Sequence, residues 1–172
     1  LYRSYFVDVA STATQLSFAD LQWGDAEATT VAAVLPRYTS VTSLDLSHNK
    51  IGPVGAADLA SAVGGMASLT AIDISYNEIG KEQALNLVSI FKEKDQMKSV
   101  GLASCNLGVD GAKAVADYVS GSAGLTSIDV GSNELDEEAA LGIVRAARQH
   151  DRMTSLGLAL CKIGPAGATE IA

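Results

Sequence analysis

The chain repeats itself every 28 residues, and this period constrains its fold more than any other feature. Six hydrophobic residues recur at this spacing, and each is followed two positions later by a second one. Because alternate residues of a strand face the same side, each pair predicts a short strand with one buried face. The pairs are Leu16 and Phe18, Leu44 and Leu46, Ile72 and Ile74, Val100 and Leu102, Ile128 and Val130, and Leu156 and Leu158.

A helical pattern follows each strand. After a hydrophobic residue that is usually followed by glycine, as in Ile51-Gly52, the spacing changes from two to i, i+3, i+4, i+7. The series Ala56, Leu59, Ala60 and Val63 shows this spacing. Equivalent series begin at Ala28 (continuing through Val31 and Ala32 to Leu35), Ala84, Ala112 and Ala140. Each unit is therefore predicted to be strand, turn and helix.

A single unit of this kind cannot bury both its strand face and its helical stripe, so neighbouring units must stack. We expect an α/β solenoid, a horseshoe with parallel strands on its concave face and helices on its convex face. Residues 1–172 are expected to form one array, in which 1–12 are the end of a preceding helix or a cap and 13–172 are six repeats, the last incomplete. The chain is expected to be part of a longer protein.

The stretch Leu44-Asp45-Leu46-Ser47-His48-Asn49-Lys50-Ile51-Gly52 resembles the core of ribonuclease-inhibitor-type leucine-rich repeats. The resemblance spans roughly residues 13–172 and is also shared with Ran GTPase-activating proteins and innate immune receptors. It implies the fold, but the fold alone does not choose a function.

One turn position separates two kinds of repeat. It is occupied by Asn49, Asn77, Cys105, Asn133 and Cys161. Mid-strand residues follow the same alternation in the later repeats, as Asp73, Gly101, Asp129 and Gly157. Such alternation of two variants is similar to that of ribonuclease-inhibitor-type proteins. We expect the asparagines to satisfy turn backbone groups between repeats and the two cysteines to be buried, unbridged thiols.

The strand positions that face away from the core form the candidate partner-binding surface. The candidate residues are Ser43, Asp45, Ser47, Asp73, Ser75 and Asp129, with His48 and Tyr76 at the rim directly after their strands. Asp45 and Asp73 are expected on adjacent strands, roughly 5 Å apart. Like charges at that separation cost stability unless a cation or a basic partner meets them. A solvated surface or a partner's Lys or Arg is favoured over a bound cation.

The sequence favours no enzyme. The two histidines, His48 and His150, stand at different phases of the repeat, so no Ser/His/Asp or Cys/His arrangement is supported. No metal-ligand spacing and no phosphate-binding loop occurs, so neither a metal nor a cofactor is expected. The charge clusters around Lys92-Glu93-Lys94 and Arg145 are expected on the solvated helix side.

Net charge restricts the partner class. With a net charge of −8, the chain repels other negatively charged surfaces, which disfavours nucleic acid and anionic membranes as partners. No run of about 18 apolar residues occurs, and the two cysteines favour a reducing compartment, so we expect a cytoplasmic location.

Three functions remain open. The favoured one is a protein interaction module or scaffold in a larger protein, which binds another protein through the concave face. A GTPase-activating protein resembling the Ran regulators is an alternative, although the early turn Leu21-Gln22-Trp23-Gly24-Asp25 lacks the arginine of that family. An architectural part of a large assembly is the other alternative. The oligomeric state stays open.

Overall fold

A computed structural model describes residues 12–171, through which one parallel six-stranded sheet runs in sequential order. Each strand pairs with the next at the 28-residue spacing, for example Leu44 with Ile72. The strands are β1 (Gln15–Ser17), β2 (Ser43–Asp45), β3 (Ala71–Asp73), β4 (Ser99–Gly101), β5 (Ser127–Asp129) and β6 (Ser155–Gly157). The register confirms the predicted stacking of repeats.

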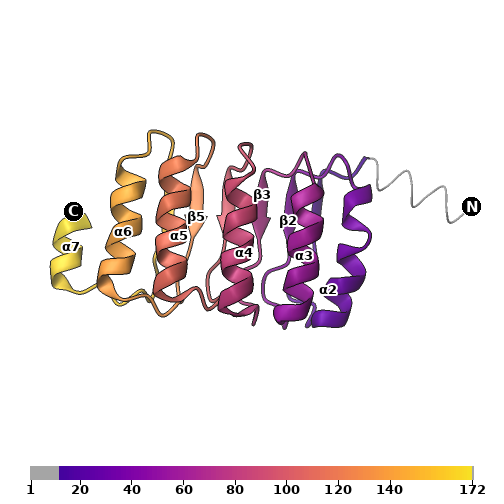
Figure 1. Cartoon of the computed structure of the whole chain (residues 1–172), viewed down its shortest axis with the longest axis horizontal. Coiled ribbons are helices and arrows are strands. Elements are labelled where there is room, and N and C mark those ends of the chain that lie inside the picture. The colour runs from indigo at the N-terminus through magenta and orange to yellow at the C-terminus, as the bar shows by residue number, and fades with distance from the viewer. Residues whose placement is uncertain (1–11, 172) are drawn as a thin grey trace, which may run out of the picture.

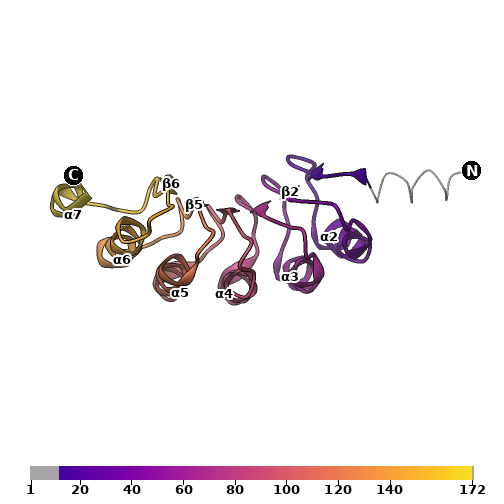
Figure 2. The ribbon, with the colours of Figure 1, turned by 90° about the horizontal axis from the view of Figure 1, so that it is seen from above.

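One helix follows every strand. The helices are α2 (Asp25–Ala32), α3 (Pro53–Gly65), α4 (Gly80–Lys92), α5 (Gly108–Gly121), α6 (Glu137–Arg148) and α7 (Pro165–Ile171). They stand side by side in one row (Figure 1). Viewed from above, the helices form the outer layer of a shallow arc and the strands the inner layer (Figure 2). The predicted α/β solenoid, with strands on the concave side, is confirmed in the described residues.

Helix α2 is shorter than the periodicity predicts. The series from Ala28 was expected to continue to Leu35, but α2 ends at Ala32 and a 3₁₀ turn, Leu35–Arg37, follows. Pro36 explains the difference, because proline lacks the N–H that a continuing α-helix needs. Leu35 is nevertheless fully buried, so its place in the core is as expected.

The core is a thin continuous layer between sheet and helices. The inward strand residues Leu44 and Leu46 are 1% and 0% exposed, and the turn residue Ile51 is 0% exposed. Alanine occupies the helix position closest to the sheet, and the alanines at this position from Ala28 to Ala140 are fully buried. A methyl side chain permits the close approach of helix and sheet that such a layer requires.

The array bounds remain a prediction. Of the predicted terminal helix or cap in residues 1–12, all but Thr12 lie outside the described residues. Within residues 12–171, no helix is long and apolar enough to cross a membrane.

Candidate functional site

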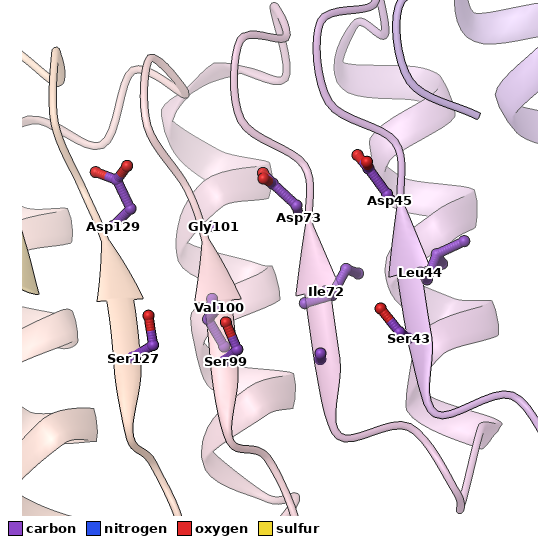
Figure 3. Close-up of a pocket in the computed structure, with 11 residues that line it drawn as sticks. Ser43, Leu44, Asp45, Ile72, Asp73, Ser99, Val100, Gly101, Ser127 and Asp129 are labelled. Carbon is purple, nitrogen blue, oxygen red and sulfur yellow. The ribbon is translucent and has the colours of Figure 1, made fainter. Parts of the chain in front are cut away.

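Three carboxylates lie in a row across the concave face. The register pairs Asp45 with Asp73 and places Gly101 between Asp73 and Asp129. Together with Ser43, Ala71, Ser99 and Ser127 they line a shallow hollow of about 310 Å³ over strands β2 to β5. The side chains of Asp45, Asp73 and Asp129 point out from the sheet on the same side (Figure 3). We call this region the concave hollow.

Each of these carboxylates uses one oxygen to hold its own strand end. Oδ1 of Asp45 accepts hydrogen bonds from the Ser47 N–H at 3.0 Å and the Ser47 hydroxyl at 2.7 Å. Oδ1 of Asp73 accepts from the Ser75 N–H at 2.9 Å. In Asp129, the same atom accepts from the Gly131 N–H at 2.9 Å. The hollow has no Lys, Arg or His among its lining residues, so the carboxylates lack a basic counter-group there.

Two of the predicted surface serines are buried, which corrects the prediction. Ser47 is 7% and Ser75 4% exposed, and the analogous Ala103 is 1% exposed. The strands end at Asp45 and Asp73, so strict alternation stops there. Ser47 then turns onto Asp45, while the Ser75 hydroxyl accepts a bond from the Ala103 N–H at 3.1 Å. Both serines therefore support the turns from within.

The rim carries a stacked pair of rings. His48 and Tyr76 lie on neighbouring turns, with ring centroids 4.3 Å apart and planes inclined by 12°. Both residues have left-handed backbones, with φ of 55° and 58°. Such a conformation is uncommon for residues other than glycine. Tyr76 is 46% exposed, so the pair presents an aromatic edge beside the concave hollow.

Asparagine side chains bridge successive turns. Asn133 is 0% exposed, and its Oδ1 accepts from the N–H groups of Cys105 at 2.9 Å and Leu107 at 3.1 Å. Its Nδ2 donates to the carbonyls of Leu102 at 2.7 Å, Val130 and Gly131. Asn49 makes the equivalent three bonds to the turn before it. Asn77 makes two of them, accepting from the Ile51 N–H and donating to the Leu46 carbonyl. These side chains are structural, because every bond serves the backbone.

The two cysteines occupy the same turn position, and both are free and buried. The thiol of Cys105 donates to the carbonyls of Ile74 at 3.4 Å and Ala103 at 3.5 Å. Burial raises the pKa of Cys105 to about 12 and also raises the pKa of Cys161. A thiol held protonated is a poor nucleophile and a poor metal ligand. Among residues 12–171, no group of three His, Cys, Asp or Glu could hold a metal ion.

Two acidic residues cap the helix of the next repeat, a role that the sequence analysis missed. Oδ1 of Asp25 accepts from the N–H groups of Gly52 and Gly55, both at 2.8 Å. Oε1 of Glu137 likewise accepts from Gly164 at 3.0 Å and Gly167 at 2.9 Å. A carboxylate at a helix N-terminus accepts hydrogen bonds from N–H groups that have no partner within the helix. Its negative charge also interacts favourably with the positive end of the helix dipole. The sequence did hold a signal for this capping role. Each of the two acidic residues is the first residue of a helix and stands 27 positions before a glycine.

Lys94 was expected on the solvated helix side but is only 8% exposed. Its ammonium donates to the carbonyls of Met66 at 2.9 Å and Gly64 at 3.3 Å, at the end of α3. Burial lowers the pKa of Lys94. Two repeats later, Nε2 of His150 lies 2.5 Å from the carbonyl oxygen of Ser122. Both side chains therefore cap the preceding repeat, and the 56-residue alternation extends to this side of the array.

Comparisons with known proteins agree with this architecture. A family model described as Leucine Rich repeat matches residues 39–60, 65–87 and 153–172. No curated protein sequence matches the chain. Among solved structures, the tropomodulin C-terminal domain of Caenorhabditis elegans is similar at a TM-score of 0.69 and 10% identity, covering 83% of this chain and 89% of that one. Leiomodin-1 Actin-Binding Site 2 is similar at a TM-score of 0.59 and 11% identity, covering 96% of this chain and 84% of that one.

Proposed function

The chain is a leucine-rich repeat protein, and from this premise we propose that it is a protein interaction module whose partner docks on the concave face. The observation that carries the proposal is the concave hollow, where three carboxylates face solvent without a basic residue in the lining. A partner that brings Lys or Arg to the hollow would relieve the repulsion between neighbouring carboxylates. The proposed partner is therefore a protein with a basic surface.

The rim supplies what the hollow lacks. Interfaces gain most from a few aromatic or arginine anchors, and the lining residues of the hollow include neither kind. Tyr76, 46% exposed and stacked on His48, offers such an anchor in the turn that follows β3, the strand that Asp73 ends. Its ring face and edge can contact an apolar or cationic group of a partner. The proposed interface thus combines the row of carboxylates with this aromatic edge.

Charge removal tests the proposal without disturbing the turns. The Asp45→Asn, Asp73→Asn double variant keeps an Oδ1 acceptor for Ser47 and Ser75 but removes two charges. The Asp117→Asn, Asp151→Asn double variant, which also removes two charges but at exposed positions outside the hollow, is the matched control. We expect proteins captured from a cell extract by the unaltered chain and by the control to be lost or strongly reduced with the Asp45→Asn, Asp73→Asn variant. Capture that is the same for all three proteins contradicts docking in the hollow.

Actin is a specific candidate partner to include, because the similar leiomodin-1 structure is named an actin-binding site. At 11% identity that likeness concerns the fold alone, so it says nothing about matching surfaces. Co-sedimentation of the chain with actin filaments gives the answer directly. If the chain pellets and the Asp45→Asn, Asp73→Asn variant does not, actin is the partner of the concave hollow. Equal pelleting of both would place actin on another surface.

A further inference from the structure

The stack of rings at the rim ends at Tyr76. Four successive turns adopt the same left-handed backbone at one position, with φ from 53° to 58°, at His48, Tyr76, Ser104 and Ser132. Because the backbones match, the side chains at this position leave their turns in the same direction. His48 covers one face of the Tyr76 ring, so the other face is directed along the array toward the turn of Ser104. A ring at Ser104 would continue the stack, but serine leaves the place of that ring open.

A second hollow, of about 390 Å³, lies over the same turns. Its lining runs from Glu78, two residues after Tyr76, to Glu134 two turns later. Ser104 and Ser132 lie between them in the lining. We call this region the turn hollow. It therefore occupies the side of Tyr76 on which the stack of rings ends.

Hydrogen-bond acceptors line the turn hollow without a basic residue among them. Glu78, Asn106 and Glu134 occupy one position in three successive turns, so neighbours in this row are roughly 5 Å apart at the backbone. Both glutamates are exposed, and within residues 12–171 neither forms an ion pair. The same position is Lys50 in the turn before and Lys162 in the turn after, and neither lysine lines the hollow. Negative charge is thus confined to the turns next to the open ring face.

We propose that the turn hollow takes an arginine side chain of the partner, with its guanidinium stacked on the open face of Tyr76 above Ser104. This inference rests on the proposed function, because it identifies the basic group that a partner on the concave face presents at the rim. A guanidinium is planar, so it can take the place of a third ring in a parallel stack. Its N–H groups can donate to the Glu78 carboxylate and the Asn106 amide oxygen.

A lysine side chain fits this place less well. Its ammonium is compact and strongly hydrated, and it has no plane that could lie on a ring. It would keep its attraction to the carboxylates of both hollows but gain little from Tyr76. The rim therefore discriminates between two kinds of basic partner, which the charge of the concave hollow alone does not.

Two synthetic peptides of equal length and charge test this, one alternating glycine with arginine and the other glycine with lysine. Isothermal titration calorimetry at low ionic strength measures their affinities for the full chain. We expect the arginine peptide to bind about fivefold more tightly. Tyr76→Ser gives this turn the side chain that the next turn carries at Ser104, and it should abolish the preference. Leu160→Ser, at the same turn position but outside the turn hollow, is the matched control and should retain it.

Filling the open place is the complementary test. Ser104→Tyr puts a ring on the open face of Tyr76 and leaves every carboxylate unchanged, and the backbone suits it because Tyr76 has the same conformation. We expect this variant to lose the preference for arginine and to bind the lysine peptide as the unaltered chain does. A preference that persists in Tyr76→Ser or in Ser104→Tyr overturns the proposal, as does failure of the unaltered chain to bind either peptide.

The Asp45→Asn, Asp73→Asn variant separates this inference from the proposed function. If the unaltered chain binds both peptides equally and the variant weakens both, the arginine site is overturned and docking in the concave hollow stands. If the variant binds both peptides as the unaltered chain does, and only Tyr76→Ser removes the preference, the arginine site stands and docking in the concave hollow is contradicted.

Discussion

Asparagine turns and cysteine turns hold their neighbours by different means. The Asn133 side chain makes five hydrogen bonds to backbone groups, two as acceptor and three as donor. The Cys105 thiol makes two long contacts, both as donor. Both residues are 0% exposed, so burial does not distinguish them. The two kinds of repeat therefore contribute unequally to the hydrogen bonds between turns: asparagine turns make many and cysteine turns make few. Both kinds belong to one continuous core.

The same alternation governs the strands. The carboxylate of Asp73 leans over Gly101, where an added Cβ would come within 2.3 Å of its Oδ1. Asp129 leans over Gly157 with the same separation of 2.3 Å. Glycine therefore stands opposite each of these aspartates on the next strand, because a side chain there would clash with the carboxylate. At Asp45 the next strand carries Asp73 instead, and there the Ser47 hydroxyl holds the carboxylate.

Replacing Asn133 by cysteine tests the comparison most severely. Asn133→Cys should remove the acceptor for Cys105 and Leu107 and leave their N–H groups buried without a partner. We expect the free energy of unfolding to fall by about 3 kcal/mol. Urea denaturation measures it, and a loss below about 1 kcal/mol would show that the two turn types are interchangeable.

Adding a methyl group at Gly101 tests the strand alternation. Gly101→Ala should push the Asp73 carboxylate away from the Ser75 N–H and cost about 1–2 kcal/mol. Gly142→Ala, in α6 with nothing within 4 Å of its added Cβ, is the control and should be neutral or stabilising. Thermal unfolding of both variants separates the two cases, and an equal response would remove the steric explanation.

Removing the Cys105 thiol should have a smaller effect and a distinctive pH dependence. Cys105→Ala should cost about 1 kcal/mol at neutral pH, from a small cavity and two weak contacts. Burial raises the pKa of Cys105 from 9.0 to about 12, so the unfolded chain loses this proton first as pH rises. The stability of the unaltered protein should therefore fall as pH rises from 9 towards 12. Urea midpoints across this range should show a weaker fall for Cys105→Ala.

Replacing Tyr118 should have the smallest effect on the free energy of unfolding, and it should stabilise the protein, whereas replacing Asn133, Gly101 or Cys105 destabilises it. Its side chain is 1% exposed, and within the described residues its hydroxyl has no hydrogen-bond partner, unlike the fully bonded asparagines. Tyr118→Phe should raise the free energy of unfolding by about 0.5–1 kcal/mol, because a buried unsatisfied hydroxyl is removed. A melting temperature below that of the unaltered protein would show that the hydroxyl is satisfied in solution.

Much of the fold follows from the hydrophobic period, whereas the site follows from it only in part. The positions of Asp45, Asp73 and Asp129 on one face were predictable, because a strand alternates strictly. Ser47 and Ser75 were misplaced since the strands stop two residues earlier. Lys94 was misplaced because a charged side chain near a helix end gives no sign of the carbonyls it will meet in the preceding repeat.

The sequence by itself determined the repeat length, the order of strand and helix, and the two alternating kinds of turn, because these depend on contacts between residues that are close in the chain or equivalent by period. Only the tertiary structure decided which polar groups meet. Asn133 finds its three partners in the preceding repeat 26 to 31 residues away, and His48 stacks on Tyr76 across a full repeat. Such pairings depend on how neighbouring turns lie against each other, and the periodicity of hydrophobic residues carries no record of that geometry.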